Sequence, residues 1–84
     1  MYIKFPVGVN ELHNVEIDYD MFNSKVYIYV DGVLKETIVL SGRPKEIKFQ
    51  VGESEKHDVY ILVRGKTIPV TTVYVDNNLL GTFR

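Results

Sequence analysis

The sequence contains no cysteine among its 84 residues. This absence excludes disulfides, thiolate nucleophiles, and zinc or iron–sulfur centres held by thiolates. The chain also lacks any run of like charge, because its ten basic and eleven acidic residues are spread along it and sum to a formal charge of −1. Nonspecific attraction to nucleic acid or to an anionic membrane is therefore not expected.

Long apolar stretches are missing as well. No apolar run approaches the ~18 residues of a membrane span, and residues 1–6 lack the basic and apolar stretches of a secretion signal. We therefore expect a cytoplasmic location. The length leaves no room for a second core, so residues 1–84 are expected to form one domain. With 45% hydrophobic residues, that domain must be stabilised by packing alone.

No segment shows the apolar spacing of an amphipathic helix, whereas alternation with a period of two runs through most of the chain. Val15, Ile17 and Tyr19, for example, alternate with Glu16 and Asp18. The same rule predicts strands over residues 2–7, 15–19, 25–31, 33–40, 45–51, 57–64, 67–76 and 79–83. Each of these strands is expected to bury one face.

Turn signals separate the predicted strands. Asp31-Gly32 is the clearest hairpin turn, since primed turns need positive φ, which aspartate and glycine tolerate. Connections this short make neighbouring strands antiparallel. We expect an all-β fold, an antiparallel β-sandwich of seven to eight strands, with a partly open β-barrel as the alternative. Pro6 and Pro69 predict edges, strand starts or bulges, because proline cannot donate to the ladder.

Two of the predicted hairpins are alike in sequence. Residues 29–34 resemble residues 74–79, and Thr37 and Thr82 follow them at the same distance. The residue preferences of hairpin turns account for this similarity, with duplication of the chain as the alternative.

Several short patterns resemble one known family. They are His13-x-Val15-Glu16-Ile17, Val30-Asp31-Gly32, Phe49-x-Val51-Gly52, Val59-x-Ile61 and Tyr74-x-Asp76 with Leu79. Together they resemble the Fas apoptotic inhibitory molecule family over about residues 13–80. The resemblance implies a compact antiparallel β-sandwich without a catalytic centre, which acts in the cytosol through protein contacts. This chain departs from the family pattern in lacking tryptophan and in corresponding to one domain instead of two.

The residues that commonly carry chemistry form no recognisable motif. His13 and His57 each begin a predicted strand, where exposure to solvent is expected, and they lack the spacing of a metal site. Asp18 and Asp20 share a strand face, but no calcium-binding loop follows them. No serine stands in a Gly-x-Ser-x-Gly motif, and no glycine-rich phosphate loop is present. We therefore predict no catalytic residue, no metal, no cofactor and no enzyme activity.

Tyrosines provide the candidate binding residues: Tyr27, Tyr29, Tyr60 and Tyr74. They are enriched in interfaces because they combine a broad apolar ring with a polar tip. Simple cross-strand pairing, or one row facing the core, is the alternative. We predict a noncatalytic protein-interaction module, with small-ligand or carbohydrate binding as the alternative function. A concave pocket would favour a ligand, whereas a flat apolar patch or an open strand edge would favour a protein partner. Nucleic acid and membrane partners are not expected.

Residues 26–30 form the segment most able to pair with another chain, because it is β-forming, uncharged and free of proline. If this strand lay at a sheet edge, self-association or addition of a partner strand would be expected. If it were central, the segment would already be paired.

Overall fold

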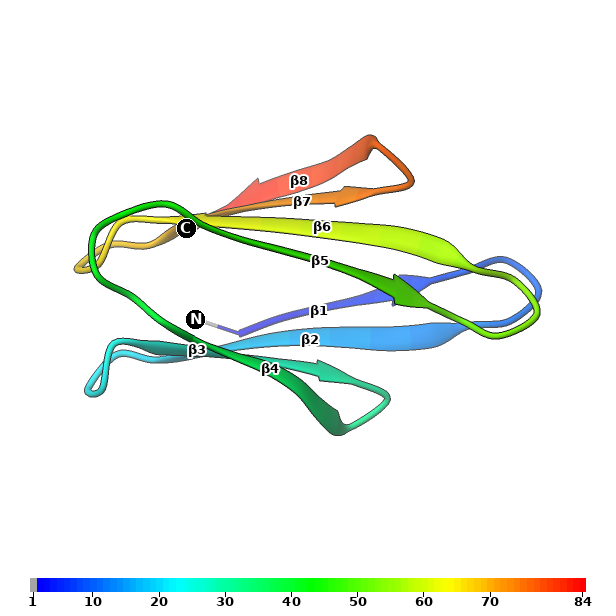
Figure 1. Cartoon of the computed structure of the whole chain (residues 1–84), viewed down its shortest axis with the longest axis horizontal. Helices are drawn as coiled ribbons and strands as arrows, with labels where there is room; N and C mark the ends of the chain where they lie inside the picture. The colour runs from blue at the N-terminus through cyan, green and yellow to red at the C-terminus, as the bar shows by residue number, and fades with distance from the viewer. Residues whose placement is uncertain (1) are drawn as a thin grey trace.

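The computed structural model describes residues 2–84, which form two four-stranded antiparallel sheets packed as two layers (Figure 1). The first sheet contains β1 (Tyr2–Val7), β2 (His13–Asp20), β3 (Lys25–Val30) and β4 (Val33–Val39), in chain order. The second contains β5 (Lys45–Val51), β6 (His57–Arg64), β7 (Val70–Val75) and β8 (Asn78–Phe83), also in chain order. The predicted all-β sandwich is confirmed with eight strands, and neither sheet closes into a barrel. Residues 2–84 contain no helix that could cross a membrane.

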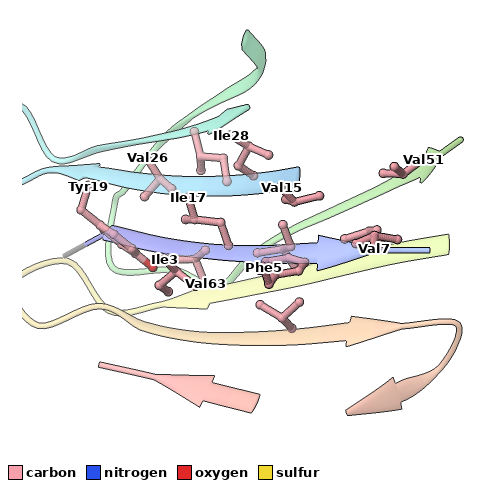
Figure 2. Close-up of a cluster of buried hydrophobic side chains, with 14 of the residues drawn as sticks. Ile3, Phe5, Val7, Val15, Ile17, Tyr19, Val26, Ile28, Val51 and Val63 are labelled. Atoms are coloured by element: carbon pink, nitrogen blue, oxygen red, sulfur yellow. The ribbon is translucent and has the colours of Figure 1, made fainter. Parts of the chain in front are cut away.

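The core follows directly from the alternation in the sequence. One face of most strands carries apolar residues, and these faces meet between the sheets, as Figure 2 shows for side chains from β1, β2, β3, β5 and β6. The expectation that every strand buries one face is wrong for the edge strands β4, which buries only Ile38, and β8, which buries no residue fully. The buried apolar residues are Ile3, Phe5, Val7, Val15, Ile17, Tyr19, Val26, Ile28, Ile38, Leu40, Val51, Val59, Ile61, Val63 and Val73. Burial of each aliphatic side chain stabilises the fold by about 1.5–3 kcal/mol before the entropy cost of ordering the chain.

Of the two prolines, Pro6 lies in a strand with the predicted bounds, and Pro69 explains the main difference between predicted and observed strands. Pro6 lies in β1, which is an edge strand, as the sequence predicted. Pro69 lies outside β7, which begins at Val70 and not at residue 67. Because β7 pairs with strands on both sides, a proline within it would remove a ladder hydrogen bond.

The two sheets repeat one another in sequence as well as in topology. Residues 3–17 and 47–61 align without a gap. The identical pairs are Ile3/Ile47, Lys4/Lys48, Phe5/Phe49, Val7/Val51, Gly8/Gly52, Glu11/Glu55, His13/His57, Val15/Val59 and Ile17/Ile61. The later hairpins also correspond, after an insertion in the β6–β7 loop, which is slightly longer than the β2–β3 loop. Hairpin preferences explain too little of this pattern, so the chain is best described as two copies of a four-stranded unit.

The loops of the two units meet at one end of the sandwich. The β1–β2 loop and the β5–β6 loop lie side by side there (Figure 1). The β4–β5 connection, the start of β1 and the end of β8 lie at the opposite end (Figure 1). One end of the sandwich is therefore formed by loops of both units.

Candidate functional site

The four candidate tyrosines lie in two different sheets. Tyr27 and Tyr29 belong to β3 of the first sheet, while Tyr60 and Tyr74 belong to β6 and β7 of the second. In each strand the tyrosines alternate with buried residues, so their side chains lie on the outer faces of the sandwich. The four tyrosines therefore do not form one surface, and none of the tyrosine rows faces the core.

Tyr60 and Tyr74 belong to a row of side chains that crosses the whole second sheet. The strand register pairs Lys48 with Tyr60, Tyr60 with Tyr74, and Tyr74 with Leu79. The two rings lie with their centroids 5.8 Å apart and their planes tilted by 55°. The Lys48 Nζ lies 5.5 Å from the Tyr60 ring centroid, which is within the range of a cation–π contact.

Three members of this row, Lys48, Tyr60 and Tyr74, line a hollow of about 750 Å³ on the outer face of the second sheet, which we call the tyrosine hollow. Its lining consists of Glu46, Lys48, Phe49, Gln50, Asp58, Val59, Tyr60, Leu62, Tyr74 and Asn77. Aromatic and aliphatic groups therefore adjoin amide, carboxylate and ammonium groups.

Hydrogen bonds hold part of the lining in place. The Tyr60 hydroxyl donates to Glu46 Oε2 at 2.5 Å, and this bond raises the pKa of Tyr60. The Gln50 side-chain amide donates to Asp58 Oδ1 at 3.1 Å. These contacts fix polar groups on either side of the Tyr60 ring.

The first sheet carries the corresponding row with one decisive difference. Its register pairs Lys4 with Glu16, Glu16 with Tyr29, and Tyr29 with Leu34. A carboxylate at Glu16 thus occupies the place that the Tyr60 ring takes in the second sheet. Tyr27 and Tyr29 consequently stand beside acidic neighbours on β2, since Tyr27 is paired with Asp18.

Each histidine contacts two carboxylates, which the sequence did not predict. His13 contacts Asp31 Oδ2 through Nδ1 and Glu11 Oε2 through Nε2, both at 2.5 Å. The hydrogen bond with Asp31, followed by that with Glu11, raises the pKa of His13. Only 23% of its side chain is exposed, so the expectation of a solvated strand end is wrong.

His57 repeats this arrangement in the second unit. Its Nδ1 contacts Asp76 Oδ2 at 2.5 Å, and its Nε2 contacts Glu55 Oε1 at 2.7 Å. Its pKa is raised by the hydrogen bond with Asp76 and then by that with Glu55. Because both ring nitrogens of each histidine are engaged by carboxylates, neither imidazole has a nitrogen free to bind a metal or accept a proton from a substrate.

The glutamate of each unit also reaches the loop of the other unit. Glu11 accepts hydrogen bonds from the backbone amides of Glu53 and Ser54, at 2.7 Å and 2.9 Å. The hydrogen bond with His13, followed by those from the two amides, lowers the pKa of Glu11 to about 2.

Glu55 makes the reciprocal contacts. It accepts hydrogen bonds from the backbone amides of Val9 and Asn10, at 2.5 Å and 2.8 Å. Its hydrogen bond with His57 contributes most to a pKa lowered to about 2. We call the two glutamates and the amides they bind the reciprocal clasp, because each unit holds the other at the same end of the sandwich.

The clasp depends on a glycine at the start of each loop. Gly8 and Gly52 have φ angles of +114° and +103°, a region that side-chain-bearing residues rarely adopt. A Cβ would lie 2.0 Å from the Glu11 carbonyl oxygen at Gly8 and 1.9 Å from that of Glu55 at Gly52. The repeated pattern Gly-x-x-Glu-x-His was the signal in the sequence that could have predicted the clasp.

Comparison with protein-family models, with curated proteins and with solved structures gives no match in any of the three searches. The resemblance to the Fas apoptotic inhibitory molecule family thus stays a prediction. Among residues 2–84, no group of three or more histidine or acidic side chains is arranged to hold a metal ion.

Proposed function

We propose that this protein is a noncatalytic binding domain whose ligand binds in the tyrosine hollow. The hollow itself is the observation that carries the proposal. Its volume of about 750 Å³ falls in the range of small-molecule sites, which are about 300–1,000 Å³. Its lining combines the rings of Tyr60 and Tyr74 and the aliphatic side chain of Leu62 with charged and amide groups that can orient a ligand.

The arrangement of the titratable groups supports a noncatalytic role. Proton transfer by histidine needs a ring nitrogen within reach of the substrate. In this fold both nitrogens of His13 and of His57 contact carboxylates that themselves bind backbone amides. The histidines are best explained as structural members that keep the loops of the two units together.

A protein partner is a second candidate, favoured by the edge strand β8. The other edge strands carry charged residues or proline, whereas β8 has no charged residue and exposes Leu79 and Leu80. Uncharged edges are favourable places for a partner strand to pair. The segment 26–30 is not available in this way, because β3 is paired on both sides. Cytoplasmic location and membership of the Fas apoptotic inhibitory molecule family are part of this proposal and rest on the sequence alone.

Amide NMR spectra of the whole chain test the proposal. A panel of monosaccharides, disaccharides, alkylammonium compounds and blocked amino acids would be added in turn. At least one probe is expected to shift the resonances of Lys48, Tyr60 and Tyr74, and the shifts should be lost in the Tyr60→Ala/Tyr74→Ala variant.

The matched control is Tyr27→Ala/Tyr29→Ala, which removes two tyrosines from the other outer face and should leave binding intact. The spectra themselves report whether each variant is folded. If every probe leaves the hollow unchanged, or if the control variant abolishes binding equally, the proposal is wrong.

A further inference from the structure

The tyrosine hollow contains two carboxylates without a cationic partner. Glu46 and Asp58 both line it, and their side-chain contacts are with neutral donors, the Tyr60 hydroxyl and the Gln50 amide. Throughout residues 2–84, every ion pair joins one of the two histidines to Glu11, Asp31, Glu55 or Asp76, none of which lines the hollow. Because Lys48 is the one cationic residue in the lining, the hollow carries a net negative charge.

One cation of the chain already lies against the aromatic lining of this hollow. The ammonium group of Lys48 lies 5.5 Å from the centroid of the Tyr60 ring. Donation of the Tyr60 hydroxyl proton to Glu46 shifts electron density toward the ring, which strengthens its attraction for a cation. The neighbouring ring of Tyr74, tilted by 55°, provides a second aromatic surface over which no cation of the described chain lies.

We infer that the tyrosine hollow binds a lysine or arginine side chain presented by a polypeptide partner, with its cation against Tyr74 and near Glu46 and Asp58. This inference rests on the proposed function and specifies the chemistry of the ligand. Charge complementarity favours a cationic ligand, since the lining has more carboxylates than ammonium groups.

A polypeptide suits the rest of the hollow better than a free amine does. The volume of about 750 Å³ is far larger than an ammonium group needs. Gln50 and Asn77 offer amide groups that match the hydrogen-bonding groups of a peptide backbone. The uncharged edge strand β8 is the neighbour of β7, with Leu79 paired to Tyr74, so an extended segment added to that edge would lie one strand away from the lining of the hollow.

A pair of probes that differ only in the terminal ammonium group tests the charge requirement on the whole chain. The probes are N-acetyl-lysine-N-methylamide and the neutral analogue N-acetyl-norleucine-N-methylamide, titrated while amide resonances are followed. The lysine probe is expected to bind about three- to fivefold more tightly than the norleucine probe, in keeping with an exposed cation–π contact. Glu46→Gln should lower the affinity for the lysine probe by a similar factor.

Substitution of Lys48 tests the inference in the opposite direction, because it should raise the affinity for the lysine probe, whereas loss of a purely structural residue would not. Lys48→Met removes the resident cation and its repulsion, so it should raise the affinity for the lysine probe about two- to fivefold. Lys4→Met alters the corresponding position of the first sheet and should leave the affinity unchanged. Weaker binding of the lysine probe to Lys48→Met would overturn the inference.

The remaining outcomes separate this inference from the proposed function. If a sugar, or the norleucine probe, binds the hollow as tightly as the lysine probe does, the cation requirement is wrong and the binding site stands. If tetramethylammonium binds as tightly as the lysine probe, the polypeptide source is wrong. If no probe shifts the resonances of the hollow, both the inference and the proposed function are wrong.

Discussion

The residues that hold the sandwich together, on the inner faces and in the clasp, are nearly the same in the two sheets. The sheets differ on their outer faces. Core residues such as Ile17 and Ile61 are identical in the two units and fully buried. The Gly-x-x-Glu-x-His pattern that begins at Gly8 also recurs at Gly52. On the outer faces, by contrast, Glu16 of the first sheet stands where the second has Tyr60. The inner faces and the clasp are constrained by packing and hydrogen bonding, whereas the outer faces are free to diverge.

One outer-face hydrogen bond, between a tyrosine and a glutamate, occurs in both sheets, but the two residue types occupy opposite positions. The Tyr2 hydroxyl donates to Glu16 at 2.8 Å in the first sheet, while the Tyr60 hydroxyl donates to Glu46 in the second. Each bond joins the same two strand positions, but tyrosine and glutamate have changed places. The exchange moves an aromatic ring from the edge strand to the middle of the sheet, where it can form a wall of the hollow.

The largest expected effect comes from the loop glycines. Gly8→Ala and Gly52→Ala should each destabilise the fold by about 3 kcal/mol or more, because each adds a Cβ overlapping a backbone carbonyl at positive φ. Urea denaturation measures both losses. Gly42→Ala is the control, since its Cβ meets no atom within 4 Å and should cost only about 1–2 kcal/mol. A loss at Gly8 or Gly52 as small as that of the control would contradict the role given to these loops.

A smaller effect is expected where the two cores differ. Thr71 is fully buried with a hydroxyl that makes no hydrogen bond in the described chain, and Val26 occupies the corresponding position of the first unit. Thr71→Val should therefore stabilise the fold by about 1 kcal/mol. The reverse change, Val26→Thr, should destabilise it by about 1–3 kcal/mol. Thermal unfolding measures both, and a loss of stability in Thr71→Val would show that the hydroxyl has a partner.

The clasp, together with the two histidines that contact its glutamates, predicts that stability decreases at both low and high pH. Hydrogen bonds with Asp31 and Asp76 raise the pKa values of His13 and His57 above 6.5, so the folded state binds these protons more tightly. Their contribution is complete below pH 6.5 and is lost as the pH rises through the raised values.

The glutamates act in the opposite direction. The pKa values of Glu11 and Glu55 fall from 4.5 to about 2, so their contribution is complete above pH 4.5 and is lost as the pH falls toward 2. The urea midpoint should therefore be highest between pH 4.5 and 6.5. The alkaline decline should disappear in His13→Asn/His57→Asn. A midpoint of the unmodified chain that increases steadily above pH 6.5 would refute this account.

The smallest effect on stability, and the most specific one on binding, should come from making the outer faces alike. Glu16→Tyr converts the first row to lysine, tyrosine, tyrosine and leucine, which is the order found in the second. As a surface change it should alter stability by no more than about 0.5 kcal/mol. It should create a second, weaker site for the lysine probe, seen as new shifts at Lys4 and Tyr29. Shifts that remain confined to the second sheet would show that the row alone does not make the site.

Local signals were sufficient to predict the strands and the overall sandwich. Alternation and glycine or asparagine turns depend on neighbouring residues, so β1, β5 and β6 were predicted with their observed bounds. The hollow depends on which strands pair and in which register, and the sequence alone did not place Tyr60 beside Tyr74. The clasp joins loops that are distant in the chain, although the repeated Gly-x-x-Glu-x-His pattern carried the information.

Amide NMR spectra of Glu11→Gln and Glu55→Gln test the central claim, that two copies of one unit hold each other reciprocally. Replacing Glu11 should move the amide resonances of Glu53 and Ser54, which lie in the other unit, and replacing Glu55 should move those of Val9 and Asn10. Changes confined to the loop that carries each substitution would contradict the claim.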